Sequence, residues 1–80
     1  MIDAKEAVKK AKEYLANLYN GSVEDMKLEE IEIDDSQSYW IVTISFFTAD
    51  KQNIIVHKEY KTIKIKNSDG EVLGMKIARF

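Results

Sequence analysis

The 80-residue chain has no cysteine, one histidine and only three glycines, and each shortage removes a class of site. Without cysteine there is no disulfide, no thiolate metal site and no thiol nucleophile. The single histidine, His57, excludes a metal site built on a histidine pair. Three glycines do not form a glycine-rich phosphate loop, which argues against nucleotide chemistry.

The chain also lacks a long apolar segment. The longest apolar run, Trp40 to Ala49, is interrupted by hydroxyl side chains, and it falls far short of the ~20 residues that span a bilayer. The first twenty residues carry several lysines and acids, so they contain no apolar signal-peptide core. We therefore expect a soluble, cytoplasmic protein with no membrane partner; a signal peptide removed earlier would leave no trace here.

Length and composition indicate one globular domain, residues 1–80, with one modest core. The net charge of −2 conceals an asymmetry, because residues 1–50 hold five basic and eleven acidic side chains and residues 51–80 hold seven and three. The net negative charge of the chain argues against nucleic-acid binding, although a local basic face is compatible with such binding.

Residues 3–20 show the pattern of an amphipathic helix. Asp3 is a good N-cap, and Glu6 three residues later completes a capping-box pattern. Apolar side chains recur on one side at helical spacing, namely Ala4, Val8, Ala11, Leu15 and Leu18. Asn20-Gly21 then ends the helix, because glycine adopts the left-handed C-cap conformation without strain. The alanine-rich stripe predicts packing against a sheet.

Four strands are predicted after the helix, at about 24–34, 38–48, 54–66 and 71–79. The turns between them carry polar turn residues, and Asp69-Gly70 is the strongest hairpin signal in the chain. No connection is long enough for a parallel crossover. The predicted fold class is α+β, with one N-terminal helix packed on a four-stranded antiparallel meander, in the order α-β-β-β-β.

Two of these strands change phase. In 24–34 the apolar alternation slips midway, and one extra residue near Glu29-Glu30, a β-bulge, would restore it. In 54–66 Tyr60 falls on the face opposite Ile63 unless a second bulge lies near Lys61-Thr62. The sequence leaves the register of the first half of that strand open.

The second predicted strand is the most apolar stretch of the chain and has apolar residues on both faces. We expect the helix to cover one face, formed by Trp40, Val42, Ile44 and Phe46. No other segment supplies cover for the second face. The candidate interface on it consists of Tyr39, Ile41 and Phe47, joined by Val56 and Tyr60. Exposed apolar clusters of this kind usually mark an interface.

Several short motifs together resemble PepSY-type domains, which share the helix-on-meander shape of cystatins and monellin. The similar segments are Ile2-Asp3-Ala4-Lys5-Glu6-Ala7, Tyr39-Trp40-Ile41-Val42, and Ile63-Lys64-Ile65 with Asp69-Gly70-Glu71-Val72-Leu73. The chain departs from the family pattern where Lys66 replaces the usual aspartate and Asp69 the usual threonine. The resemblance implies a domain that restrains a peptidase, or inhibition of cysteine proteases among cystatin relatives. The inhibitory loop of cystatins is absent, so inhibition is assigned to no residue.

Catalysis has little support in the sequence. His57 is accompanied by Glu59 and, across a hairpin, by Ser45, yet no glycine-rich nucleophile turn surrounds this serine. The acidic stretch 29–35 lacks the Asp-x-Asp-x-Asp-Gly pattern of calcium loops. We therefore predict no enzyme activity, no cofactor and no metal site.

A second candidate site is the basic patch of Lys58, Lys61, Lys64, Lys66, Lys76 and Arg79. With Tyr60 among them, these residues could form a basic face for nucleic acid. Alternatively they keep the sheet soluble, or pair with the acidic first strand of another copy. The leading hypothesis is a non-catalytic protein-binding or self-associating module, with regulatory or inhibitory roles open. It would bind a protein partner or a second copy through the open sheet face or an edge strand.

Overall fold

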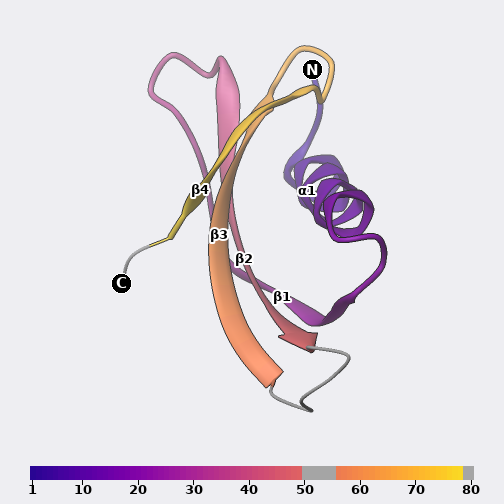
Figure 1. The fold of residues 1–80 in the computed structure, drawn as a ribbon. Helices are drawn as coiled ribbons and strands as arrows, with labels where there is room; N and C mark the ends of the chain where they lie inside the picture. The colour runs from indigo at the N-terminus through magenta and orange to yellow at the C-terminus, as the bar shows by residue number, and fades with distance from the viewer. Residues whose placement is uncertain (50–55, 79–80) are drawn as a thin grey trace.

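The computed structural model describes residues 1–49 and 56–78 of the chain. These residues form one helix and four strands: α1 (Ala4–Leu18), β1 (Val23–Ile33), β2 (Tyr39–Ala49), β3 (Val56–Lys66) and β4 (Val72–Ile77). The strands form one antiparallel sheet in the order β1-β2-β3-β4, and α1 lies along one side of it (Figure 1). The predicted α+β class and meander order are confirmed.

The two ends of α1 carry the predicted caps. The side chain of Asp3 accepts a hydrogen bond of 2.8 Å from the backbone N–H of Glu6. At the other end Tyr19 is the C-cap, and Asn20 and Gly21 follow with φ of 53° and 77°, the left-handed region that stops a helix. The predicted helix, 3–20, therefore exceeds the observed one only by its capping residues.

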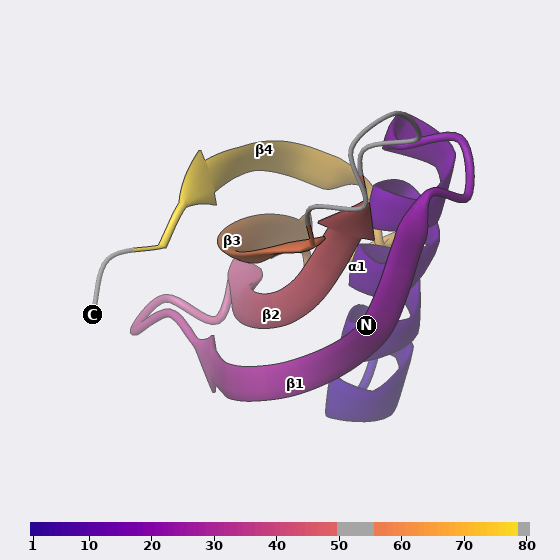
Figure 2. The same cartoon turned by 60° about the horizontal axis from the view of Figure 1, so that its bottom comes forward.

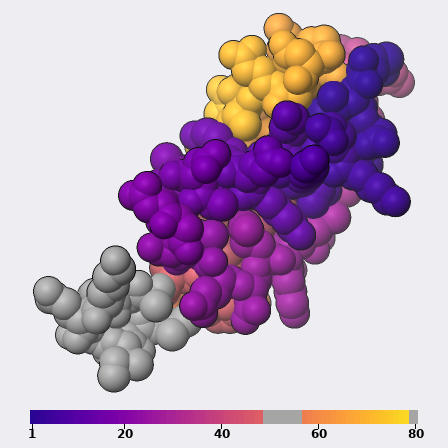
Figure 3. Space-filling model, turned by 90° about the vertical axis from the view of Figure 1, so that its right-hand side faces the viewer, coloured from indigo at the N-terminus to yellow at the C-terminus, as the bar shows by residue number. Residues whose placement is uncertain are grey.

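The core lies between α1 and the sheet. Its fully buried members are Ala7, Ala11 and Leu15 from α1, Val42, Ile44 and Phe46 from β2, and Ile63 and Ile65 from β3. Because two of the helical members are alanines, the helix axis can approach the strands closely. Seen from the helix side, α1 lies across the sheet with β4 visible beyond it (Figure 3). We call this covered side of the sheet the helix face.

Among residues 1–49 and 56–78, no helix lies on the opposite side of the sheet, which we call the open face. Figure 2 shows the strands stacked in order from β1 to β4 with α1 on one side of the stack only. Successive side chains of a strand point to opposite faces. In β2 the side chains of Val42, Ile44 and Phe46 are buried on the helix face. The odd-numbered residues Tyr39, Ile41 and Phe47 therefore point to the open face. The predicted division of the central strand between two faces agrees with this arrangement.

The β1–β2 ladder contains two register shifts. One lies between Leu28 and Glu30, where the sequence predicted a bulge, and this prediction is confirmed. The other lies between Glu24 and Lys27 and was not predicted; Asp25 adopts a φ of 52° there. Both shifts occur at an outer strand, where bulges interrupt the row of free backbone groups.

The β2–β3 ladder is continuous, from the Tyr39–Lys66 pair to the Ala49–Val56 pair. No bulge therefore lies near Lys61-Thr62, and Tyr60 stands opposite Ser45 on the open face. This ladder fixes the register that the sequence left open from Val56 onward, whereas 54–55 lie outside the described residues.

The last strand is shorter than the sequence indicated. β4 ends at Ile77, and of the predicted strand 71–79 Glu71 and Ala78 are not strand residues, while 79 lies outside the described residues. A register shift at Lys64/Ile65 separates the Lys64–Gly74 and Ile65–Val72 pairs and makes Leu73 the extra residue. Among the described residues, no helix has the length and apolar character needed to cross a membrane.

Candidate interaction surface

Three stripes of different chemistry run along the strands of the open face. Their members are the acidic Glu24, Glu30 and Glu32 on β1, the apolar Tyr39, Ile41 and Phe47 on β2, and the basic Lys58, Lys64 and Lys66 on β3. Residues directly opposite each other in an antiparallel ladder point to the same face. The acidic and basic charges of these stripes are thus separated across the width of the sheet, except at Lys27, which lies opposite Ser45 within the β1 stripe.

The ladder partners also define rows that cross the strands. One row is Glu32–Ile41–Lys64, and near the other end of the sheet a second row is Glu24–Phe47–Lys58. Each of these two rows changes from an acid on β1 to an apolar residue on β2 and a base on β3. We call them the charged rows.

Between the charged rows the open face carries small hydroxyl residues. Thr43 and Ser45 are 6% and 1% exposed, although α1, the helix that the structure describes, lies on the other face. The hydroxyl of Thr43 lies 3.1 Å from that of Thr62, and the Ser45 hydroxyl donates a 3.0 Å hydrogen bond to Glu29 Oε2. The hydroxyls in the middle of the face are therefore already paired.

Lysine side chains partly cover the aromatic rings of the open face. The Lys64 ammonium lies 3.8 Å from the centroid of the Tyr39 ring. The Lys58 ammonium lies 5.6 Å from the ring of Phe47 and 5.3 Å from that of Tyr60. Tyr39, Phe47 and Tyr60 are therefore half-buried, and the apolar face is less bare than the sequence alone suggests.

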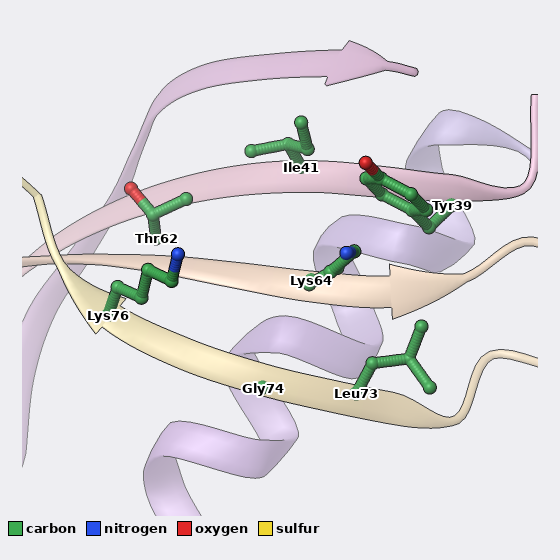
Figure 4. A pocket seen from close by; sticks show the side chains of 7 residues that line it. All are labelled: Tyr39, Ile41, Thr62, Lys64, Leu73, Gly74 and Lys76. Carbon is green, nitrogen blue, oxygen red and sulfur yellow. The ribbon is translucent and has the colours of Figure 1, made fainter. Parts of the chain in front are cut away.

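A shallow hollow of about 400 Å³ opens between β2, β3 and β4 on this face (Figure 4). It is lined by Tyr39, Ile41, Thr62, Lys64, Leu73, Gly74 and Lys76. A Cβ atom at Gly74 would meet no heavy atom within 4 Å, so the missing side chain of this glycine creates part of the space. Apolar surface in the hollow is bordered by the two lysines.

The predicted interface residues are brought together. Tyr39, Ile41, Phe47 and Tyr60 all lie on the open face and all are half-buried. Val56 is paired through its backbone with Ala49 at the start of β3, but its side chain lies outside what the structure describes.

The predicted basic patch is divided between the two faces. Lys58, Lys64, Lys66 and Lys76 lie on the open face, since their ladder partners do. Lys61 stands opposite Ile44 and therefore lies on the helix face. Its side chain is only 13% exposed, and its ammonium is 3.7 Å from Glu59 Oε1. Arg79 lies outside the described residues.

This Lys61–Glu59 pair belongs to a small polar cluster beside the C-terminal end of α1. Glu59 also accepts a 3.1 Å hydrogen bond from the Thr48 hydroxyl. Burial raises the pKa of the Tyr19 phenol, and the negative charge of Glu59 raises that pKa further. This cluster was not predicted from the sequence, although the alternation that buries Ile63 already places residues 59 and 61 on the same face.

The residues considered for catalysis do not form a site. Ser45 is opposite Tyr60 on the open face, whereas His57 is opposite Thr48 and so projects from the other side of the sheet. A serine and a histidine on opposite faces cannot act as nucleophile and base. The described residues contain no group of three or more His, Asp or Glu side chains placed to hold a metal ion.

The two outer strands offer less for docking than the open face. β1 is interrupted by its two register shifts, and β4 has six residues. Short and bulged outer strands are features that limit the addition of a further strand. Comparison of the chain with family models, with curated proteins and with solved structures finds no match. The resemblance to PepSY-type domains therefore stays a prediction.

Proposed function

We propose that this chain is a non-catalytic protein-binding module and that the open face of its sheet is the binding surface. The observation that carries the proposal is the joint placement of Tyr39, Ile41, Phe47 and Tyr60 on a face that no helix of the described residues covers. Aromatic and aliphatic side chains at the centre of a patch, with charges around them, are the usual composition of a protein interface.

The surroundings of these residues support the same function. The central hydroxyls of Thr43 and Ser45 are already hydrogen-bonded, so covering them with a partner leaves no new polar group unpaired. The acidic residues of β1 and the basic residues of β3 border the apolar residues of β2 on its two sides, an arrangement that steers a partner of complementary charge. The outer strands, with their bulges and short length, are the weaker alternative surface.

The proposal can be tested with a photo-crosslinking amino acid in place of Ile41 or Phe47 in cells that naturally make the protein. A matched control carries the same amino acid at Lys9, an exposed residue of α1. We expect the two open-face positions to yield one common adduct, identified by mass spectrometry, and position 9 to yield none. Equal adducts at all three positions, or none on the open face, would show that the surface is not used.

A second candidate function, nucleic-acid binding, is favoured by one observation: Lys58, Lys64, Lys66 and Lys76 share the open face. Against it, the three glutamates of β1 occupy the same face, and the lysines already lie over the rings that would stack on bases. Binding of single-stranded RNA or DNA at low salt, lost on raising the salt and weakened by Lys64→Ala but not by Lys61→Ala, would establish this function.

A further inference from the structure

We propose that the partner of the open face is a second copy of this chain, packed face to face across a two-fold axis that runs along β2. This inference rests on the proposed function and names its partner. It is carried by the order of charges across the sheet, since the open face is complementary to itself in one orientation only.

The complementarity follows from the charged rows. A two-fold axis along β2 places each row over its own copy in the reverse direction. Glu32 of one copy then faces Lys64 of the other, and Glu24 faces Lys58, while Ile41 and Phe47 meet their own equivalents. Each charged row contributes two opposite-charge pairs around an apolar centre.

The row between them fits the same axis. Lys27 stands opposite Ser45, which in turn stands opposite Tyr60. The reversed row of the second copy places its Tyr60 ring under Lys27, a cation over an aromatic face. Lys27 is the basic residue that interrupts the acidic stripe, and this geometry gives its charge a partner.

The other face-to-face arrangement is excluded by charge. A two-fold axis in the plane of the interface but perpendicular to the strands would place β1 over β1 and β3 over β3 of the second copy. Glutamates would then face glutamates and lysines would face lysines, which is repulsive. The distribution of charge therefore selects the axis parallel to β2.

In this complex the ammonium groups of Lys58 and Lys64 can each contact a glutamate of the second copy. Lys58 and Lys64 lie over aromatic rings of their own chain in the single copy. Exposed cation–ring contacts are weak and are exchanged readily for a carboxylate partner. Movement of each ammonium from the ring to a glutamate of the second copy uncovers the ring for apolar contact across the interface.

The size of the face limits how much surface the pairing can bury. Strands of eleven residues across a four-stranded sheet give a face of about 36 Å by about 14 Å at ~3.3 Å per residue and ~4.8 Å per strand spacing. Two such faces bury on the order of 1,000 Å², the lower limit of a specific interface. We expect a reversible dimer whose fraction depends on protein concentration.

The test uses two charge-reversal variants and their mixture. The first carries Glu24→Lys and Glu32→Lys, and the second carries Lys58→Glu and Lys64→Glu. Each variant alone presents like charges to its own copy, so its dimer dissociation constant should rise at least about tenfold over wild type. An equimolar mixture restores opposite charges in every row and should form the mixed dimer. Sedimentation measures the association, and native mass spectrometry distinguishes the mixed dimer by mass.

Controls carry charge changes of the same sign on α1, away from the open face. Glu13→Lys with Asn17→Lys, and Lys5→Glu with Lys9→Glu, alter exposed residues of the helix only. These variants should dimerise as wild type does. Circular dichroism of all variants shows whether loss of association reflects loss of folding.

The outcomes separate this inference from the proposed function. A wild-type chain that stays monomeric, or reversal variants that still self-associate, would overturn the pairing; so would a mixture that fails to form the mixed dimer. If the crosslinker at Ile41 then traps a different protein, the face is a binding surface for that protein and only the second copy is wrong. If Ile41→Asp changes neither association nor crosslinking at Phe47, the open face itself is not the binding surface.

Discussion

The indole Nε1 of Trp40 donates a 3.0 Å hydrogen bond to Oδ1 of Asn67, at the end of the strand beside it. Asn67 is 3% exposed, and its Nδ2 donates to the carbonyl of Gln37 at 2.8 Å. Its backbone N–H donates to the carbonyl of Ser38, and its own carbonyl accepts from the N–H of Ile2. One buried asparagine thus links the residues before α1, the turn before β2 and the turn after β3.

Replacement of Asn67 by alanine should lower the free energy of unfolding by about 1–2 kcal/mol, because the half-buried Trp40 N–H and the Gln37 carbonyl each lose a hydrogen bond to a buried side chain. Urea unfolding followed by tryptophan fluorescence measures the change. Ser68→Ala, at the exposed neighbouring residue, is the control and should change stability by less than about 0.5 kcal/mol. Equal stability of both variants would show that the asparagine contributes nothing.

The turn before β2 should give the chain a dependence on acid. Burial alone would raise the pKa of Asp34, but hydrogen bonds from the Ser36 side chain and from backbone N–H groups, including that of Tyr39, hold it below 3.8. Because the carboxyl group has a lower pKa in the folded state, its ionised form stabilises the fold at pH values above the pKa of the unfolded chain. This stabilisation is lost as the pH falls through the pKa of the folded state. Asp34→Asn should therefore lower the melting temperature at neutral pH, and this difference should shrink progressively as the pH falls below 3.8. Asp35→Asn, an exposed neighbour, is the control for net charge.

The polar cluster beside α1 should be visible in the titration of tyrosine. Burial, with a smaller contribution from Glu59, raises the pKa of Tyr19 above 10.0. Folding favours the protonated phenol, so the phenol contributes to the free energy of unfolding. This contribution is complete below pH 10 and is lost as the pH rises through the pKa of the folded state. Ultraviolet titration should show one late tyrosine that disappears in Tyr19→Phe. Glu59→Gln should lower that pKa only in part, and no change at all would contradict the assignment.

Two glycines should respond in opposite directions to a larger side chain. Gly74 has open space where a Cβ would stand, so Gly74→Val should stabilise the fold by about 0.5–1 kcal/mol, as expected for a β-branched residue in a strand. Gly70 has a φ of +79°, and an added Cβ would lie 3.2 Å from Lys10 Cε. Gly70→Val should therefore destabilise by about 1–2 kcal/mol. Thermal unfolding of both variants measures the contrast, and equal shifts would contradict it.

The sequence predicted the fold class, the capped helix and the two faces of β2, because these features depend on local periodicity. The bulge near Glu29-Glu30 was predictable for the same reason, since it repairs an alternation. The register shift near Asp25 was not predictable. The residues around it are mostly polar, and polar residues do not show which face of a strand each position belongs to. The spacing of apolar residues therefore predicts the register of a strand only where those residues are buried in the core.

The candidate surface was predicted incompletely. The apolar residues of the open face were identified, but Lys61 was grouped with Lys64 on the basis of charge, although the alternation with Ile63 places it on the helix face. Asn67 was missed because an asparagine near Asp69-Gly70 is typical of a turn, and nothing local distinguishes a buried one. Such long-range hydrogen bonds depend on three segments that meet only in the folded chain.

The position of α1 also has a consequence for how the chain is made. Ala7, Ala11 and Leu15 are synthesised before β3, yet their buried surroundings include Ile63 and Ile65. The Ile2–Asn67 hydrogen bond likewise waits for the turn after β3. On the ribosome β2 can cover part of the apolar stripe of the helix, but the core around the helix is complete only when β3 has emerged. Newly made chains should bind a chaperone during that interval and release it once β3 is in place.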